Sequence, residues 1–186
     1  MIIDFVPNHV ARQYHFGRTS PTVTTELGAN DDPSQSFSPY NNFYYIPQAE
    51  LRAQFDMKDG AAEPYREFPA KATGNNRFDA TPNITDWYET VKLNYGVDYQ
   101  NGGTCHFSPT PDTWIKMLDI LLFWASKHID GFRCDMAEMV PVEFGNGLFL
   151  KLKRFILKYF SSQKSIIPAN IVTICSVVSL IIYMIR

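Results

Sequence analysis

The chain has 186 residues, of which 45% are hydrophobic, and its formal net charge is −2. These values are typical of a folded domain, and they exclude an intrinsically disordered chain and a strongly basic nucleic-acid-binding domain. The charge is unevenly distributed, because residues 1–144 carry 11 Lys and Arg against 19 Asp and Glu, whereas residues 145–186 carry six basic residues and no acidic one. Ordinary variation between domains rarely produces such a break, so residues 145–186 stand apart from the rest.

The first ten residues predict a buried strand. They form a short apolar run, too brief for a helix, that breaks at Pro7 and Asn8. Residues 11–109 follow, rich in Pro, Gly, Asn, Ser and aromatic side chains and without a sustained helical period. Because so long a structureless segment is improbable inside a domain, this composition predicts an inserted, irregular, β-rich subdomain held together by aromatic side chains.

Residues 110–144 predict an amphipathic helix and a second strand. Thr110, Pro111 and Asp112 supply an N-cap, a proline at the first helical position and an acid in the first turn. Apolar residues then recur at helical spacing: Trp114, Met117, Leu118, Leu121, Leu122 and Ala125. The mixed segment 128–137 predicts the strand. Strand, insertion, helix and strand form a right-handed βαβ crossover, so the sequence predicts an α/β fold with parallel strands.

Polar side chains accompany both predicted strands: Asp4, Asn8 and His9 on the first, and Arg133 and Asp135 on the second. Sites of α/β folds assemble at the carboxyl ends of parallel strands. Arg133 lies two residues before Asp135, which puts both side chains on one face, where the guanidinium can keep a nucleophilic carboxylate ionised and oriented. Each motif alone also fits a structural turn or ion pair, but their combination across a long insertion favours a functional site.

Two motifs carry a resemblance to a known family. Asp4-Phe-Val-Pro-Asn8-His9 resembles the first signature region of the alpha-amylase superfamily of retaining glycosidases, and Gly131-Phe-Arg-Cys-Asp135 resembles the second. The resemblance implies a partial (β/α)8 TIM barrel, with barrel strand three in residues 1–10 and a B domain inserted in residues 11–109. Barrel helix three and strand four would then lie in residues 110–144.

The resemblance also implies roles for individual residues. Asp135 matches the catalytic nucleophile that forms the covalent glycosyl intermediate, and Arg133 matches the residue that orients it. His9 matches a histidine that positions the sugar by a hydrogen bond. Asn8 matches a residue that ligates a structural calcium ion in many relatives, and Asp4 matches a structural carboxylate of the same region. Calcium is therefore an expected cofactor.

The resemblance leaves one catalytic group unaccounted for. Retaining hydrolysis needs two carboxyl groups about 5 Å apart, and the family's acid/base is a glutamate at the end of the fifth strand. After Asp135 the sequence offers only Glu138 and Glu143, which come too early. The Lys-His pair common in the second region is also replaced, here by Met136 and Ala137. We expect the chain as encoded to be inactive.

The expected substrates are α-1,4-linked glucans, either starch or maltooligosaccharides, and no nucleic-acid partner is expected. Hydrolysis and transglycosylation both remain open. Two alternatives come from other classes of protein: a non-catalytic carbohydrate-binding fragment that uses the aromatic side chains of the insertion, and a membrane-anchored protein with a genuine C-terminal helix. The chain opens at Met1-Ile2-Ile3-Asp4 without the basic region, apolar core and cleavage site of a secretory signal, so the sequence assigns no compartment.

Residues 145–186 admit three interpretations. Residues 166–185 form an uncharged and mostly apolar stretch behind a basic flank, which is the minimum for a membrane-spanning helix, although Pro168 and several polar residues weaken it. Residues 148–160 alternatively form an amphipathic helix on a membrane surface. Association with a membrane follows only if this tail is genuine.

The third interpretation is that the tail is the family's own gene read out of frame. From Phe144 onward, the third base of each codon joined to the first two of the next can encode W-E-W-V-I-P-E-I-K-K. The same shift from Phe160 can encode F-I-A-E-I-Y-N-P, which resembles the family's fifth-strand motif with its acid/base glutamate. This interpretation explains the missing acidic residues, since out-of-frame translation is not selected for surface charge.

Overall fold

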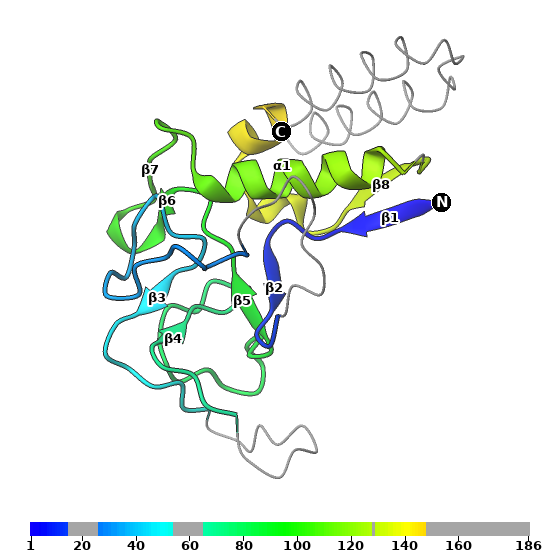
Figure 1. The fold of residues 1–186 in the computed structure, drawn as a ribbon. Helices are drawn as coiled ribbons and strands as arrows, with labels where there is room; N and C mark the ends of the chain where they lie inside the picture. Colours follow the sequence, from blue (N-terminus) through cyan, green and yellow to red (C-terminus); the bar gives the residue numbers. More distant parts are fainter. Residues whose placement is uncertain (15–25, 54–64, 128, 148–186) are drawn as a thin grey trace, which may run out of the picture. The chain divides into compact units, whose positions relative to one another are not determined.

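The computed structural model describes residues 1–14, 26–53, 65–127 and 129–147 (Figure 1). The chain divides into two compact units, Met1–Pro7 with Lys116–Arg186 and Asn8–Ile115. The predicted membrane segment, residues 166–185, lies outside the described residues. Among the helices that the described residues form, none is both long and apolar enough to cross a membrane.

The first unit contains a pair of parallel strands. β1 (Ile2–Phe5) pairs with β8 (Gly131–Cys134), and Asp4 lies opposite Arg133. The chain between them includes α1 (Asp112–Ala125), so the predicted parallel pairing with an intervening helix is confirmed. After β8, a short 3-10 helix, η2 (Ala137–Met139), is followed by helical residues 142–147.

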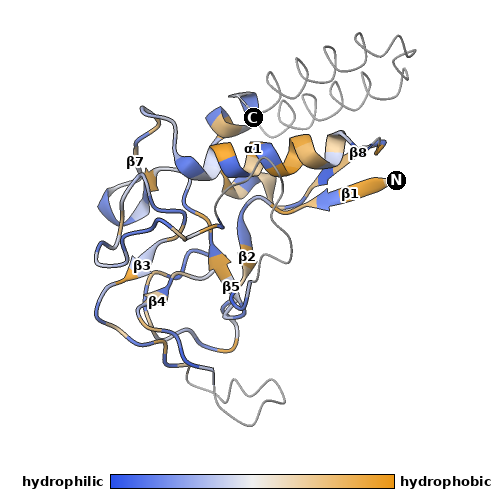
Figure 2. Ribbon diagram, in the orientation of Figure 1, coloured by the Kyte–Doolittle hydropathy of each residue, from blue (hydrophilic) through white to orange (hydrophobic). Residues whose placement is uncertain are grey.

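Helix α1 has the amphipathic character that its sequence predicts. Its sequence alternates between hydrophobic and hydrophilic positions along the ribbon (Figure 2). Met117 and Leu121 are buried, at 4% and 2% exposure, together with Phe5, Ile129 and Phe144 of the same unit. These side chains come from β1, from α1 and from the segments before and after β8. Burial of their apolar area therefore stabilises the unit.

The second unit consists of short strands and loops. Its elements are β2 (His9–Ala11), β3 (Tyr45–Ile46), β4 (Ala70–Lys71), β5 (Thr90–Lys92), β6 (Val97–Asp98), η1 (Tyr99–Asn101) and β7 (Thr104–Cys105). β2 pairs with β5, β3 with β4 and β6 with β7, each pair antiparallel. The sheets of the described residues are therefore four two-stranded pairs, and the (β/α)8 barrel and the B domain stay predictions.

Aromatic side chains form much of the core of the second unit. Tyr44 is 1% exposed and its hydroxyl donates a hydrogen bond to the carbonyl of Val97. Its ring contacts Phe37 in a stacked geometry and Phe78 edge-on, with centroids 6.1 and 5.2 Å apart. Such large side chains stabilise a unit that has little regular secondary structure, as its composition predicts.

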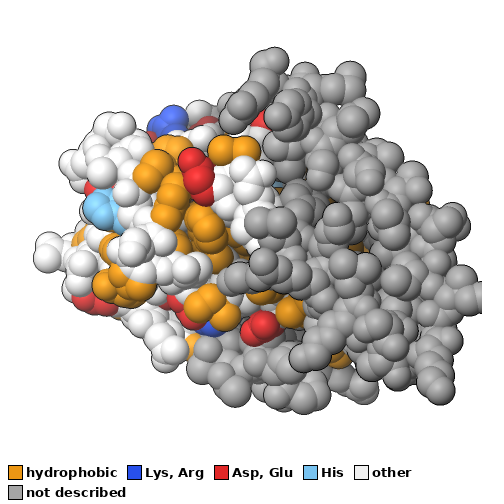
Figure 3. Space-filling view, turned by 90° about the horizontal axis from the view of Figure 1, so that it is seen from above, with side chains coloured by type: hydrophobic (Ala, Val, Ile, Leu, Met, Phe, Trp, Pro, Cys, Tyr) orange, Lys and Arg blue, Asp and Glu red, His pale blue; other side chains and the backbone are white. Residues whose placement is uncertain are grey.

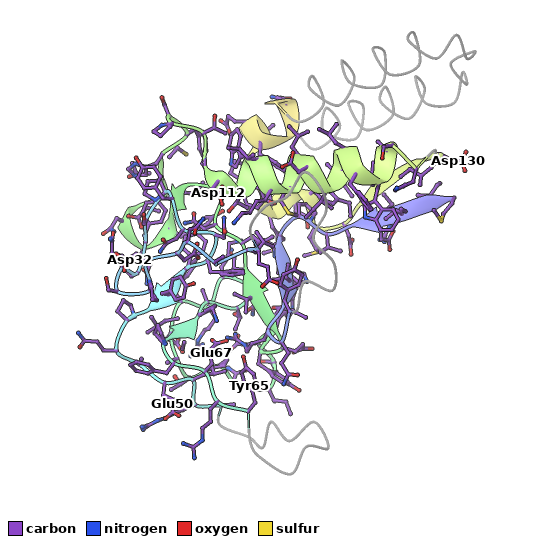
Figure 4. All side chains as sticks on the ribbon, viewed as in Figure 1. Asp32, Glu50, Tyr65, Glu67, Asp112 and Asp130 are labelled. Atoms are coloured by element: carbon purple, nitrogen blue, oxygen red, sulfur yellow. The ribbon has the colours of Figure 1, made fainter. Side chains whose placement is uncertain are left out.

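A buried ion pair lies in the second unit. Arg12 and Glu67 are separated by 2.6 Å between Nη1 and Oε1, and their side chains are only 3% and 5% exposed. Tyr65 donates its hydroxyl to the second carboxylate oxygen of Glu67, and the two side chains lie side by side in Figure 4. Arg12 also donates to the carbonyls of Tyr88 and Thr90, so both charges are fully hydrogen-bonded.

The apolar run of residues 1–10 forms two strands rather than one. β1 ends at Phe5 and β2 begins at His9, on either side of Pro7 and Asn8. Proline has no N–H to donate to a strand ladder, which explains why the pairing stops there.

Some large hydrophobic side chains remain at the surface of the described residues. Figure 3 shows such side chains beside carboxylates on one face. The most exposed in α1 are Ile115 and Trp124, at 48% and 38%, while Ile2 of β1 is 66% exposed. Scattered exposure of this kind is ordinary on α1, but it is unusual on a strand of a parallel sheet, which normally is covered on both faces.

Candidate active site

The first unit brings three of the predicted site residues together. The guanidinium of Arg133 donates through Nη1 to Oδ2 of Asp4 at 3.0 Å and through Nη2 to Oδ1 of Asp135 at 3.2 Å. The side chains of Arg133, Asp4 and Asp135 are 60%, 61% and 43% exposed. The predicted contact between Arg133 and Asp135 is therefore present, and one cation holds two carboxylates at the carboxyl ends of adjacent strands.

The strand register explains why these groups meet. Asp4 and Arg133 are direct partners across the parallel pair, so their side chains emerge on the same face. Asp135 follows two residues after Arg133, and its N–H donates to the carbonyl of Phe5 at 2.9 Å, which extends the ladder beyond β8. Phe5 and Phe132 make an edge-to-face contact with ring centroids 6.3 Å apart. Backbone pairing therefore fixes the position of Asp135.

The backbone turns sharply directly after Asp135. Met136 has φ 55° and ψ 33°, a left-handed conformation that is uncommon for residues other than glycine. This conformation costs roughly 1–2 kcal/mol for an L-residue. Backbone strain of this kind concentrates at functional sites, because it aims the neighbouring side chain. Met136 is also the N-cap residue of η2, so the turn after Asp135 leads directly into that short helix.

His9 and Asn8 belong to the second unit, where His9 contacts Asn8 and the ring of Trp87. His9 starts β2, opposite Lys92 of β5, and its Nδ1 lies 3.2 Å from Nδ2 of Asn8. Its ring meets Trp87 edge-on, with centroids 5.6 Å apart. A half-buried imidazole held against an indole presents a polar ring beside an aromatic surface.

Asn8 is fully buried and both ends of its amide are engaged. Its Nδ2 donates to the carbonyl of Gly74 at 2.7 Å, and its Oδ1 accepts a hydrogen bond from Nζ of Lys92 at 2.8 Å. Lys92 is itself only 1% exposed. The oxygen that would ligate a calcium ion therefore accepts from an ammonium group instead. The residues present do not fit the calcium ion that the resemblance implies.

Three residues of this region carry no signal in the sequence. Gly74 lies so close to His9 that a Cβ atom built there would approach the His9 Cβ and Cγ atoms to 3.0 Å and Thr90 Oγ1 to 2.7 Å. Trp87 and Lys92 sit in an unremarkable mixed segment, yet they contact His9 and Asn8. The long separation in sequence hides these contacts, since Asn8 and Lys92 are 84 residues apart.

Comparison with known proteins adds no identification. The sequence matched no family model, no curated protein and no solved structure. The geometry of the residues themselves is thus what bears on function.

Removing the charge of Arg133 is expected to leave stability almost unchanged. Its ion pairs with Asp4 and Asp135 are exposed to solvent, and such pairs contribute only about 0 to 1 kcal/mol. In urea titrations, Arg133→Gln should therefore shift the free energy of unfolding by less than about 1 kcal/mol. A loss of several kcal/mol would show that Arg133 is a structural residue rather than one retained for chemistry.

Proposed function

We propose that the chain carries part of the catalytic domain of a retaining α-glycosidase of the alpha-amylase type, acting on α-1,4-linked glucans. The observation that supports it is the placement of Arg133 between Asp4 and Asp135 at the ends of two parallel strands. An arginine so placed keeps a carboxylate ionised and fixes its lone pairs, which a nucleophilic carboxylate requires. The exposure of all three side chains is consistent with this, because a structural ion pair would gain little there.

The parallel pair itself supports a larger α/β architecture. Parallel strands occur almost only in sheets covered on both faces, and two strands alone are marginally stable in water. Ile2 of β1 is nevertheless 66% exposed. A sheet with further strands, such as the proposed (β/α)8 barrel, would bury this side chain and place the ends of β1 and β8 on the catalytic face.

In the proposed mechanism, a carboxylate oxygen of Asp135 attacks the anomeric carbon while the glycosidic C–O bond breaks. An acid donates a proton to the departing oxygen, and water later hydrolyses the glycosyl ester. Arg133 orients Asp135, and His9 positions the sugar. The 186 residues contain no glutamate beyond Glu143 to serve as that acid. We therefore propose that this chain does not turn over glucans.

Residues 145–186 are proposed to be an out-of-frame reading of the segment that holds the missing acid. The absence of any Asp or Glu in this segment supports the proposal. The shifted reading from Phe160 supplies a glutamate within a strand-like peptide. The partner group of Asp135 is thus proposed to be encoded by the gene but not translated.

A frame-restored protein tests the function. With the shifted frame restored after Phe144 in a gene that encodes all eight barrel strands, we expect hydrolysis of maltoheptaose with the α-anomer appearing first by NMR, as retention requires. Asp135→Asn should lower kcat/KM by at least about 10³-fold. Asp130→Asn is the matched control, because Asp130 is an exposed carboxylate just before β8 that contacts the amino group of Met1.

The proposal fails if the restored protein yields the β-anomer first. It fails equally if Asp135→Asn retains the activity of the restored protein, or if Asp130→Asn loses as much activity as Asp135→Asn. The unrestored chain of 186 residues should release no product from maltoheptaose.

A further inference from the structure

The buried contact between Lys92 and Asn8 has the form of a cation site. Nζ of Lys92 lies 2.8 Å from Oδ1 of Asn8, and the Lys92 and Asn8 side chains are 1% and 0% exposed. The same ammonium lies 5.2 Å from the ring centroid of Tyr99, in the geometry of a cation–π interaction. A charged group buried this deeply needs polar partners, and here the amide oxygen of Asn8 and the ring of Tyr99 face it.

The backbone around the contact is closely tied. The N–H of Lys92 donates to the carbonyl of Ala72, and the N–H of Leu93 donates to the carbonyl of Asn8. Nδ2 of Asn8 donates to the carbonyl of Gly74 at 2.7 Å. Because a carbonyl can only accept, this last bond requires that Oδ1 rather than Nδ2 faces Lys92. Together these bonds join Asn8, β5 and residues 72–74, three separate segments of the second unit.

We propose that the ammonium of Lys92 takes the place of a structural metal ion at Asn8, so that the second unit folds without calcium. A calcium ion on Oδ1 of Asn8 would have to lie 2.3–2.6 Å away, as such ions do, in space next to the ammonium that this oxygen already binds.

The consequence is a cation that cannot dissociate. A bound metal contributes to folding only when it is present, whereas a lysine is part of the chain and contributes under all metal concentrations. The inference concerns residues of this chain, and only the comparison with calcium rests on the proposed function.

Thermal unfolding of the full 186-residue chain tests the inference. We expect the same Tm in 5 mM EDTA and in 10 mM CaCl2, and no saturable calcium binding by calorimetry. Lys92→Asp removes the ammonium and puts a carboxylate beside Oδ1 of Asn8, so calcium should raise the Tm of this variant by at least about 4 °C. Lys127→Asp is the control, because Lys127 is exposed at the end of α1, and calcium should not change its Tm.

Two results overturn the inference. The first is a Tm of the unsubstituted chain that rises in calcium, or a cooperative transition that appears only when calcium is present. The second is a Lys92→Asp variant whose Tm does not rise in calcium, which would show that this position does not bind a cation. Neither measurement uses a carbohydrate or turnover, so each result is independent of the nucleophile assignment for Asp135.

Discussion

Replacing Arg12 with leucine is expected to lower the free energy of unfolding by about 3 kcal/mol, since the buried carboxylate of Glu67 loses its nearest cation and keeps only Lys71, whose Nζ lies 3.3 Å from Oε2. The carboxylate of Glu67 is only 5% exposed, and its Oε1 lies 2.6 Å from Nη1 of Arg12. The substitution also leaves the carbonyls of Tyr88 and Thr90 without the guanidinium that binds them. Urea titration followed by far-UV circular dichroism measures the loss.

Arg77→Leu is the matched control for this substitution. Arg77 pairs with Asp79 and, at 3.8 Å, with the less exposed Asp86 in the same unit, but its own side chain is 38% exposed. Its removal should cost less than about 1 kcal/mol. The double variant Arg12→Leu/Glu67→Leu should be more stable than Arg12→Leu, because the buried carboxylate is gone and the ammonium of Lys71, which also paired with it, is 24% exposed. Equal losses for Arg12→Leu and Arg77→Leu would contradict this role for the buried pair.

Between pH 8 and pH 10, the free energy of unfolding of the unsubstituted chain is expected to rise by about 2 kcal/mol relative to that of Lys92→Met. Burial lowers the pKa of Lys92 from 10.5 to about 8. In this window the unfolded chain therefore binds more protons than the folded chain, so stability increases with pH and decreases as the pH falls toward 8.

The window for that measurement ends at pH 10 because other groups then act in the opposite direction. Burial raises the pKa values of Tyr44 and Tyr45, so ionisation of these side chains in the unfolded state lowers stability above pH 10. Both proteins carry these tyrosines, and the difference between their stability curves isolates Lys92. Parallel curves from pH 8 to pH 10 would contradict a depressed pKa for Lys92.

The sequence predicted the elements that depend on local patterns. The helical spacing from Trp114 to Ala125 is that of α1, and the short apolar segments at Ile2 and Gly131 are β1 and β8. The contact between Arg133 and Asp135 was also predictable, because two residues of a strand that are separated by one share a face.

The contacts that determine the second unit were not predictable from local patterns. Arg12 and Glu67 are 55 residues apart, and Asn8 and Lys92 are 84 residues apart. In β5, alternation would place either Val91 or Lys92 at the surface, yet their exposures are 2% and 1%. The side chain of Lys92 contacts Asn8 and the ring of Tyr99, so a charged group is buried where its type predicts solvent.

We propose that Asp135 is the nucleophile of a two-carboxylate glycosidase site and that its second carboxylate is encoded out of frame. This proposal explains two observations, the contacts of Arg133 with Asp4 and Asp135 and the absence of acidic residues from residues 145–186. The coding DNA shows whether the missing carboxylate is encoded in the shifted frame.

Sequencing the gene across the codons for residues 144–186 is the most direct test. The account predicts that the frame formed by the third base of each codon and the first two of the next is open. It should encode a helix-like peptide after Phe144 and then a strand-like peptide containing glutamate from Phe160. Stop codons in that frame, or a peptide without this glutamate, would contradict the account.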